Sequence, residues 1–168
     1  MSEQYSFPEV YVAGVQGKKC LCDENGKYVV VPCAGDLGFC VKVYGSIPYE
    51  QALNYIDLLE ARVRVSMAIL QGKPGEAVYE GFLLERGVNV CLQEILGNHM
   101  YLYVKEGMSI EREHTIAHVI TGKLEIRSIR STCEGLVALV VDMPWEEPRK
   151  AVVVVTNVYR PVTARKGT

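Results

Sequence analysis

The stretch GNHMYLYVKEGMSIEREHTIAHVITGKLEIRSIRSTCEGLVALVV, residues 97–141, decides the fold of this chain. Short apolar runs in it alternate with polar residues at a period of two, which is typical of strands with one buried face. Gly107, Gly122 and Gly135 separate these runs, as turns between strands require. The stretch therefore predicts consecutive short strands and no helix.

The strand pattern continues on both sides of this stretch. After Gly75, seven segments have strand composition: residues 77–84, 88–96, 100–104, 115–120, 124–129, 136–141 and 151–158. Seven short strands at close spacing predict a barrel or a sandwich. Near the N-terminus, apolar runs at residues 10–12, 28–31 and 39–43 are separated by turn residues such as Asn25-Gly26, and they predict a β meander.

One amphipathic helix is predicted over residues 47–71. Ser46 supplies a capping hydroxyl and Pro48 suits a first helical turn. Apolar residues then recur every three or four positions, at Ala52, Leu53, Ile56, Leu59, Val63, Met67 and Leu70. Gly72-Lys73-Pro74-Gly75 would end the helix. We therefore expect residues 1–75 to form a meander plus helix and residues 76–168 a β domain, either separate from the first part or compact with it.

Composition indicates an ordinary globular protein. The 168 residues are 49% hydrophobic and 23% charged, with a net charge of -2. Acidic and basic residues are mixed along the chain, so no concentrated basic face points to a nucleic-acid partner. The N-terminus lacks a basic leader followed by an apolar stretch, and no apolar run reaches membrane-spanning length. We expect a cytoplasmic protein without a membrane partner.

Three motifs within residues 97–141 follow one another at strand-length spacing: Glu106-Gly107-Met108-Ser109-Ile110, Thr121-Gly122-Lys123 and Glu134-Gly135-Leu136-Val137. This arrangement resembles the biotinyl/lipoyl carrier domain. The resemblance implies a mostly β (α+β) chain whose C-terminal part is a barrel-sandwich hybrid of the biotinyl/lipoyl-like hammerhead kind, with the meander and helix packed on it. The whole chain is also similar to an uncharacterised archaeal family with a barrel-sandwich hybrid core, and that similarity implies a fold and no activity.

The resemblance leaves two hypotheses for Lys123, which we expect at an exposed hairpin tip. We favour a non-enzymatic interaction or binding module that carries no cofactor and docks to a protein partner or to its own copy. The residues that flank Lys123, Gly122 and Leu124, differ from the methionines of biotin carriers and from the acidic residue of lipoyl carriers. The alternative is a carrier protein with biotin or lipoate attached to Lys123.

Other candidate residues point to no catalytic set. The sequence contains no G-x-S-x-G elbow, P-loop or G-x-G-x-x-G, so we name no catalytic residue. His114 and His118 on a strand would lie too far apart to share a metal ion. Trp145, between Pro144 and Glu146, is either an anchor for a partner or a plug of the barrel end.

The cysteines lack a paired C-x2-C spacing, so isolated buried thiols are expected rather than a metal site. Disulfide bonds between some of these cysteines are an alternative if the source is a hyperthermophile. A small-molecule or metal site in the cysteine-rich N-terminal layer is a third, weaker hypothesis. The six residues are Cys20, Cys22, Cys33, Cys40, Cys91 and Cys133.

Overall fold

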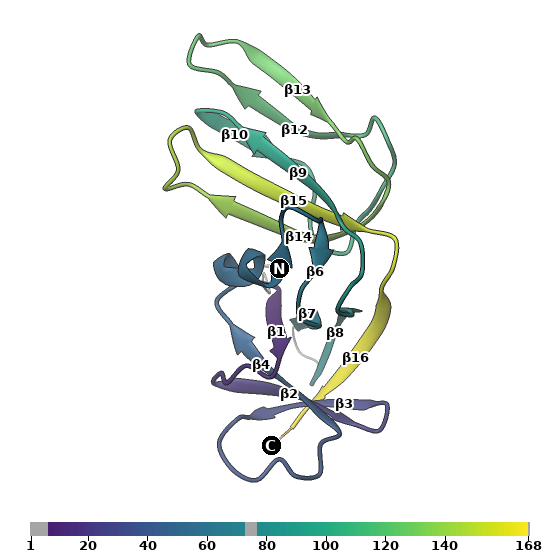
Figure 1. The fold of residues 1–168 in the computed structure, drawn as a ribbon. Helices are drawn as coiled ribbons and strands as arrows, with labels where there is room; N and C mark the ends of the chain where they lie inside the picture. Colours follow the sequence, from purple (N-terminus) through teal and green to yellow (C-terminus); the bar gives the residue numbers. More distant parts are fainter. Residues whose placement is uncertain (1–6, 73–76, 168) are drawn as a thin grey trace. The chain divides into compact units, whose positions relative to one another are not determined.

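The computed structural model describes residues 7–72 and 77–167, which fold mostly as β-strands (Figure 1). The chain divides into two compact units. The barrel unit comprises Met1–Ile56, Val63–Val88 and Tyr159–Thr168, and the two-sheet unit comprises Asp57–Arg62 and Asn89–Val158. The prediction of a mostly β chain is confirmed.

Seven strands of the barrel unit close into a barrel in the order β1-β4-β2-β3-β16-β8-β7, with β7 paired back to β1. The β3–β16 pair is parallel, and the other neighbours are antiparallel. In the described residues, each of these seven strands pairs with a neighbour on both sides. The strands are β1 (Glu9–Ala13), β2 (Lys19–Glu24), β3 (Lys27–Pro32), β4 (Lys42–Ile47), β7 (Met67–Gly72), β8 (Val78–Leu84) and β16 (Arg160–Lys166).

Alternating side chains fill the barrel. Tyr11, Leu21 and Leu70 belong to one buried core cluster, and each comes from a different strand. The β2–β3 hairpin turns on Asn25 and Gly26, whose φ angles of 62° and 96° suit a tight two-residue connection. The predicted turn is therefore confirmed. The sequence did not predict this closed barrel, because β1, β2, β3, β4 and β7 all come from the segment expected to form a meander and a helix.

The helix predicted over residues 47–71 is wrong. A 3-10 helix, η1 (Tyr49–Tyr55), ends at Ile56, where the backbone becomes extended. The chain then continues as the short strands β5 (Ile56–Asp57) and β6 (Arg62–Val63), followed by β7. Between β5 and β6, the Asp57 carboxylate accepts hydrogen bonds from the backbone N–H groups of residues 59 and 60, both at 3.0 Å. Leu59 is 97% exposed, although the helical stripe would have buried it.

The two-sheet unit contains a three-stranded sheet, β10-β12-β13, and a four-stranded sheet, β11-β14-β15-β9. Its core draws on both sheets, for example Met100 and Val119 from the first and Val137 and Val153 from the second. Each of the seven strand segments predicted after Gly75 overlaps a strand of the structure. The strands of this unit are β9 (Cys91–Leu96), β10 (His99–Leu102), β11 (Ser109–Ile110), β12 (Thr115–Ile120), β13 (Ile126–Arg130), β14 (Gly135–Met143) and β15 (Lys150–Thr156).

The predicted domain boundary after Gly75 falls at residues 73–76, which lie outside the described residues. Strands β7 and β8, on either side of this point, pair with each other from Met67–Leu84 to Gly72–Tyr79. Both strands belong to the barrel unit. The units of the structure therefore consist of interleaved segments of the chain.

Candidate functional site

Three loops meet at one end of the two-sheet unit, which we call the hairpin end: residues 97–98, 121–125 and 143–149 (Figure 1). The backbone N–H of Gly97 donates to the carbonyl of Arg149 at 3.1 Å, and that of Asn98 donates to the carbonyl of Ile120 at 3.0 Å. The β9–β10 connection therefore bonds to the β14–β15 hairpin on one side and to the end of β12 on the other. This bonding fixes the position of the hairpin end.

The β12–β13 hairpin carries Lys123 at an exposed position, as the sequence predicted. Thr121 closes the loop: its N–H donates to the Glu125 carbonyl at 2.9 Å, and its carbonyl accepts from the Leu124 N–H at 2.9 Å. Leu124 has a φ of 61°, in the left-handed region that β-turns use, and its side chain is 84% exposed. The lysine and a large apolar side chain thus share one ordered tip.

The β14–β15 hairpin is held by an ion pair at its base. The Arg149 guanidinium donates to both carboxylate oxygens of Asp142, at 3.2 Å and 2.5 Å. The hydrogen bonding to Asp142 raises the pKa of Arg149. Beyond this clamp, the Glu146 N–H donates to the Met143 carbonyl at 3.2 Å. Trp145 is 63% exposed on this hairpin, so it does not plug the end of a barrel.

Four large apolar side chains are exposed at or beside these loops. They are Leu96 (47% exposed), Leu124 (84%), Ile126 (73%) and Trp145 (63%). Single exposed apolar residues are normal on a protein surface, whereas a large contiguous apolar patch is a common feature of binding surfaces. The sequence drew attention to Trp145 alone, because the other three fall within or beside segments that read as ordinary strands.

The outer face of the three-stranded sheet continues this surface. Tyr101 on β10 lies opposite His118 on β12. The Tyr103 hydroxyl is 2.5 Å from the His118 Nδ1, and the two rings meet edge to face with centroids 5.2 Å apart. Tyr101 and Tyr103 are both exposed. The imidazole of His118 is therefore engaged by a tyrosine, and His114 lies in the turn before β12.

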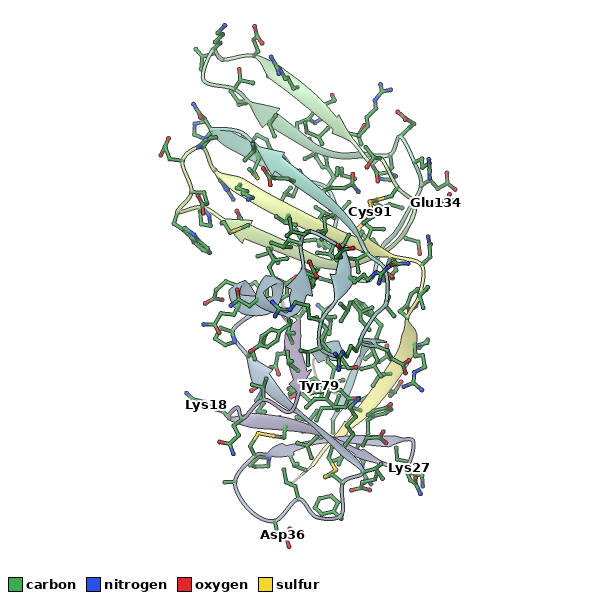
Figure 2. The ribbon with its side chains drawn as sticks, in the orientation of Figure 1. Lys18, Lys27, Asp36, Tyr79, Cys91 and Glu134 are labelled. Atoms are coloured by element: carbon green, nitrogen blue, oxygen red, sulfur yellow. A yellow bond between two sulfur atoms is a disulfide. The ribbon has the colours of Figure 1, made fainter. Side chains whose placement is uncertain are left out.

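The prediction of isolated thiols is wrong, because all six cysteines are paired: Cys20–Cys33, Cys22–Cys40 and Cys91–Cys133. Cys20 and Cys22 point away from the barrel core, since Leu21 between them points into it. Their bonds fasten the loop between β3 and β4 to the outside of β2, and Figure 2 shows Asp36 at the far end of that loop. With every thiol in a disulfide, the proposed cysteine metal site has no thiolate ligand to offer.

The third disulfide lies beside a buried polar network in the two-sheet unit. Gln93 on β9 donates from Nε2 to the Ser131 Oγ at 3.0 Å and to the Cys133 Sγ at 3.1 Å. Its Oε1 accepts the Thr132 N–H at 3.0 Å. Gln93 and Ser131 are both buried, and the network satisfies their polar groups. This arrangement holds the loop before β14, so we assign it a structural purpose.

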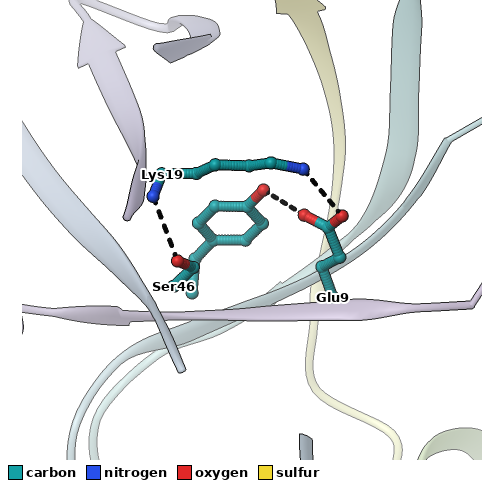
Figure 3. Close-up of polar contacts among 4 residues, drawn as sticks. Glu9, Lys19 and Ser46 are labelled. Atoms are coloured by element: carbon teal, nitrogen blue, oxygen red, sulfur yellow. Dashed lines mark hydrogen bonds and ion pairs between the residues drawn. The ribbon is translucent and has the colours of Figure 1, made fainter. Parts of the chain in front are cut away.

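A second polar cluster joins the buried Tyr11 of the barrel core to the partly exposed Glu9 and Lys19 (Figure 3). The Tyr11 hydroxyl donates to the Glu9 Oε2 at 2.5 Å, and the Lys19 Nζ donates to the Glu9 Oε1 at 3.0 Å. Burial, with the carboxylate beside it, raises the pKa of Tyr11 far above its usual range. The hydrogen bond to Glu9 raises the pKa of Lys19. Tyr11 therefore stays protonated and Lys19 stays charged at neutral pH, so neither of these two side chains offers a base or an amine nucleophile.

These observations define an all-β protein with a closed barrel, a two-sheet unit and an exposed apolar surface at one end of that unit. The chain belongs to the family described as "Uncharacterized protein conserved in archaea (DUF2118)", whose profile matches residues 5–157. A comparison with curated proteins found no match. Among the described residues, no helix is long and apolar enough to cross a membrane.

Proposed function

We propose that this protein is a non-enzymatic interaction module that binds a protein partner through the hairpin end. The observation that carries the proposal is that four large apolar side chains are exposed on these bonded loops or on the strand residues next to them: Leu96, Leu124, Ile126 and Trp145. Burying one such side chain in an interface contributes about 1.5–3 kcal/mol. A tryptophan and its apolar neighbours form the kind of cluster that dominates binding energy at protein interfaces.

Order in the loops supports the same proposal. The Arg149–Asp142 clamp and the backbone bonds of Gly97 and Asn98 fix the loops before any partner arrives. A surface that is already ordered loses less conformational entropy on binding. Binding through these exposed side chains therefore loses little conformational entropy in the loops.

The test isolates three versions of the protein from the native host, each together with any protein bound to it, and compares what is bound. Wild type and the variant with Arg112→Ala, an exposed residue in the turn before β12 of the same unit, should retain the same stoichiometric partner. The double variant Leu124→Ser and Trp145→Ala should lose it. Light scattering gives the mass of each complex, and this mass shows whether the partner is a different protein or a second copy of this chain. Retention of the partner by the double variant would contradict the proposal.

The alternative is a carrier protein of the biotinyl/lipoyl kind with Lys123 as attachment site. Its support is the position of Lys123 at an exposed tip between β12 and β13, within a unit of two sheets that share one core. A ligase has access to an amine there. The barrel-sandwich hybrid fold is proposed on the same grounds.

The intact mass of protein from the native host tests this alternative. A biotinyl or lipoyl mass on wild type that disappears in Lys123→Arg would support the carrier. An unmodified mass from cells that contain the ligases would refute it, and would leave the interaction module without a cofactor.

We also propose a cytoplasmic location. The three disulfides are compatible with it, because intracellular proteins of hyperthermophilic archaea carry many disulfides and the family is archaeal. Labelling of free thiols in intact and lysed native cells, followed by fractionation, tests both the location and the oxidised state.

A further inference from the structure

We infer that the partner meets Trp145 with a basic segment, one that presents arginine or lysine side chains to the β14–β15 hairpin. This inference rests on the proposed function and adds the chemistry of the occupant. Its starting point is the exposed indole of Trp145, and the charges around that indole select the partner.

The basic residues next to the hairpin are already paired. Arg149 is bound by Asp142, and the Lys150 Nζ lies 3.2 Å from the Glu94 Oε2. Glu146 and Glu147 are exposed, and neither forms an ion pair within residues 7–72 and 77–167. Two carboxylates without an ion-pair partner among the described residues thus follow the exposed Trp145 in the same hairpin.

This combination favours cationic side chains. A guanidinium or ammonium group over a tryptophan face gains a cation–π attraction, and a nearby carboxylate can accept its hydrogen bonds. A nucleic acid or an acidic peptide would bring negative charge against Glu146 and Glu147, which opposes binding. Lys123 lies on the other hairpin, so the basic part of the partner is expected against the β14–β15 hairpin only.

The clamp at the hairpin base strengthens the inference. Because Asp142 and Arg149 neutralise each other, the partner's cations meet the two glutamates without competition from Arg149. The bidentate geometry also limits the directions in which the hairpin can bend. A charged, ordered turn of this kind selects partners by charge as well as by shape.

The test uses the fluorescence of Trp145, the single tryptophan of the chain, as the reporter. The full-length oxidised protein is titrated with a short peptide of alternating leucine and arginine, and with its leucine–glutamate counterpart. The arginine peptide should shift the emission to shorter wavelength and bind more weakly as salt increases. The glutamate peptide should not bind.

The variant with Glu146→Gln and Glu147→Gln should bind the arginine peptide about tenfold more weakly. The variant with Glu111→Gln and Glu134→Gln removes the same charge from exposed positions before β12 and β14, outside the loops of the hairpin end, and should bind like wild type. Figure 2 shows Glu134 at the opposite end of the two-sheet unit. Equal loss in both variants would show that only net charge matters and would overturn the inference.

The outcomes separate the inference from the proposed function. If both peptides shift the emission equally, the hairpin end binds apolar segments, so the proposed function stands and the basic partner is refuted. If neither peptide shifts the emission, the inference is again overturned, while the native-host comparison decides the proposed function by itself.

Discussion

At the scale of single residues, Trp145 separates binding from folding. Its side chain is 63% exposed, so the fold gains little from its burial. We predict that Trp145→Ala changes the free energy of unfolding by less than about 0.5 kcal/mol, as surface substitutions do. Urea denaturation followed by circular dichroism measures this change. A loss of about 3 kcal/mol or more, the cost of removing a core aromatic, would show that the indole belongs to the core.

Tyr44 gives a prediction about alkaline pH. It is 2% exposed in the barrel core, and burial raises its pKa from 10.0 to about 12. The folded state therefore holds the phenolic proton more tightly than the unfolded chain does. The contribution of the Tyr44 proton to the free energy of unfolding is therefore fully present below pH 10.0 and is lost as the pH rises through about 12.

The expected loss is on the order of 2 kcal/mol. Urea denaturation near the two ends of this interval measures it. Tyr44→Phe removes the titrating group, so the variant should lose less stability over the interval than wild type. An equal loss in both proteins would place the alkaline sensitivity in other residues.

At the scale of elements, the Cys91–Cys133 bond ties β9 to the loop before β14 across a sequence separation of 42 residues. Closing a loop of that length in the unfolded chain is worth about 4 kcal/mol in the chain-entropy description. We predict that replacing both cysteines by alanine lowers the free energy of unfolding by about that amount.

The matched control replaces Cys20 and Cys33, whose separation is 13 residues. This shorter loop predicts a smaller loss, about 3 kcal/mol. Urea denaturation under oxidising conditions compares the two variants. A larger loss from the Cys20–Cys33 replacement would mean that local packing, rather than loop length, governs these bonds.

Strands and helices could be predicted where the apolar pattern of the sequence matched the burial of the side chains in the fold. Residues 115–120 are rich in β-branched and apolar residues between turn residues, and they form β12 with the predicted bounds. Residues 47–71 show apolar spacing of three and four, yet they contain Arg62-Val63-Arg64-Val65, which also alternates with a period of two. Pairing of β7 with β1 and β8 buries Met67 to Leu70 on both faces, and this tertiary burial overrides the helical pattern.

At the scale of the whole molecule, the barrel could not be read from local pattern. Its closure depends on β16 pairing with β3 and β8, which lie far away in the sequence. The pairing of six cysteines admits many connectivities and likewise needs the fold. The hairpin end has the same origin, because its loops come together only when the two sheets form. Lys123 was predictable, since a hairpin tip depends on adjacent strands alone.

The most direct measurement of the central claim is position-resolved crosslinking in native-host lysate. A photoactivatable phenylalanine analogue replaces Ile126 at the hairpin end in one protein and Leu59, an exposed residue of the β5–β6 turn, in another. The account predicts one discrete crosslinked partner from position 126, competed by wild-type protein, and none from position 59. The same crosslinked species from both positions, or none from position 126, would contradict it.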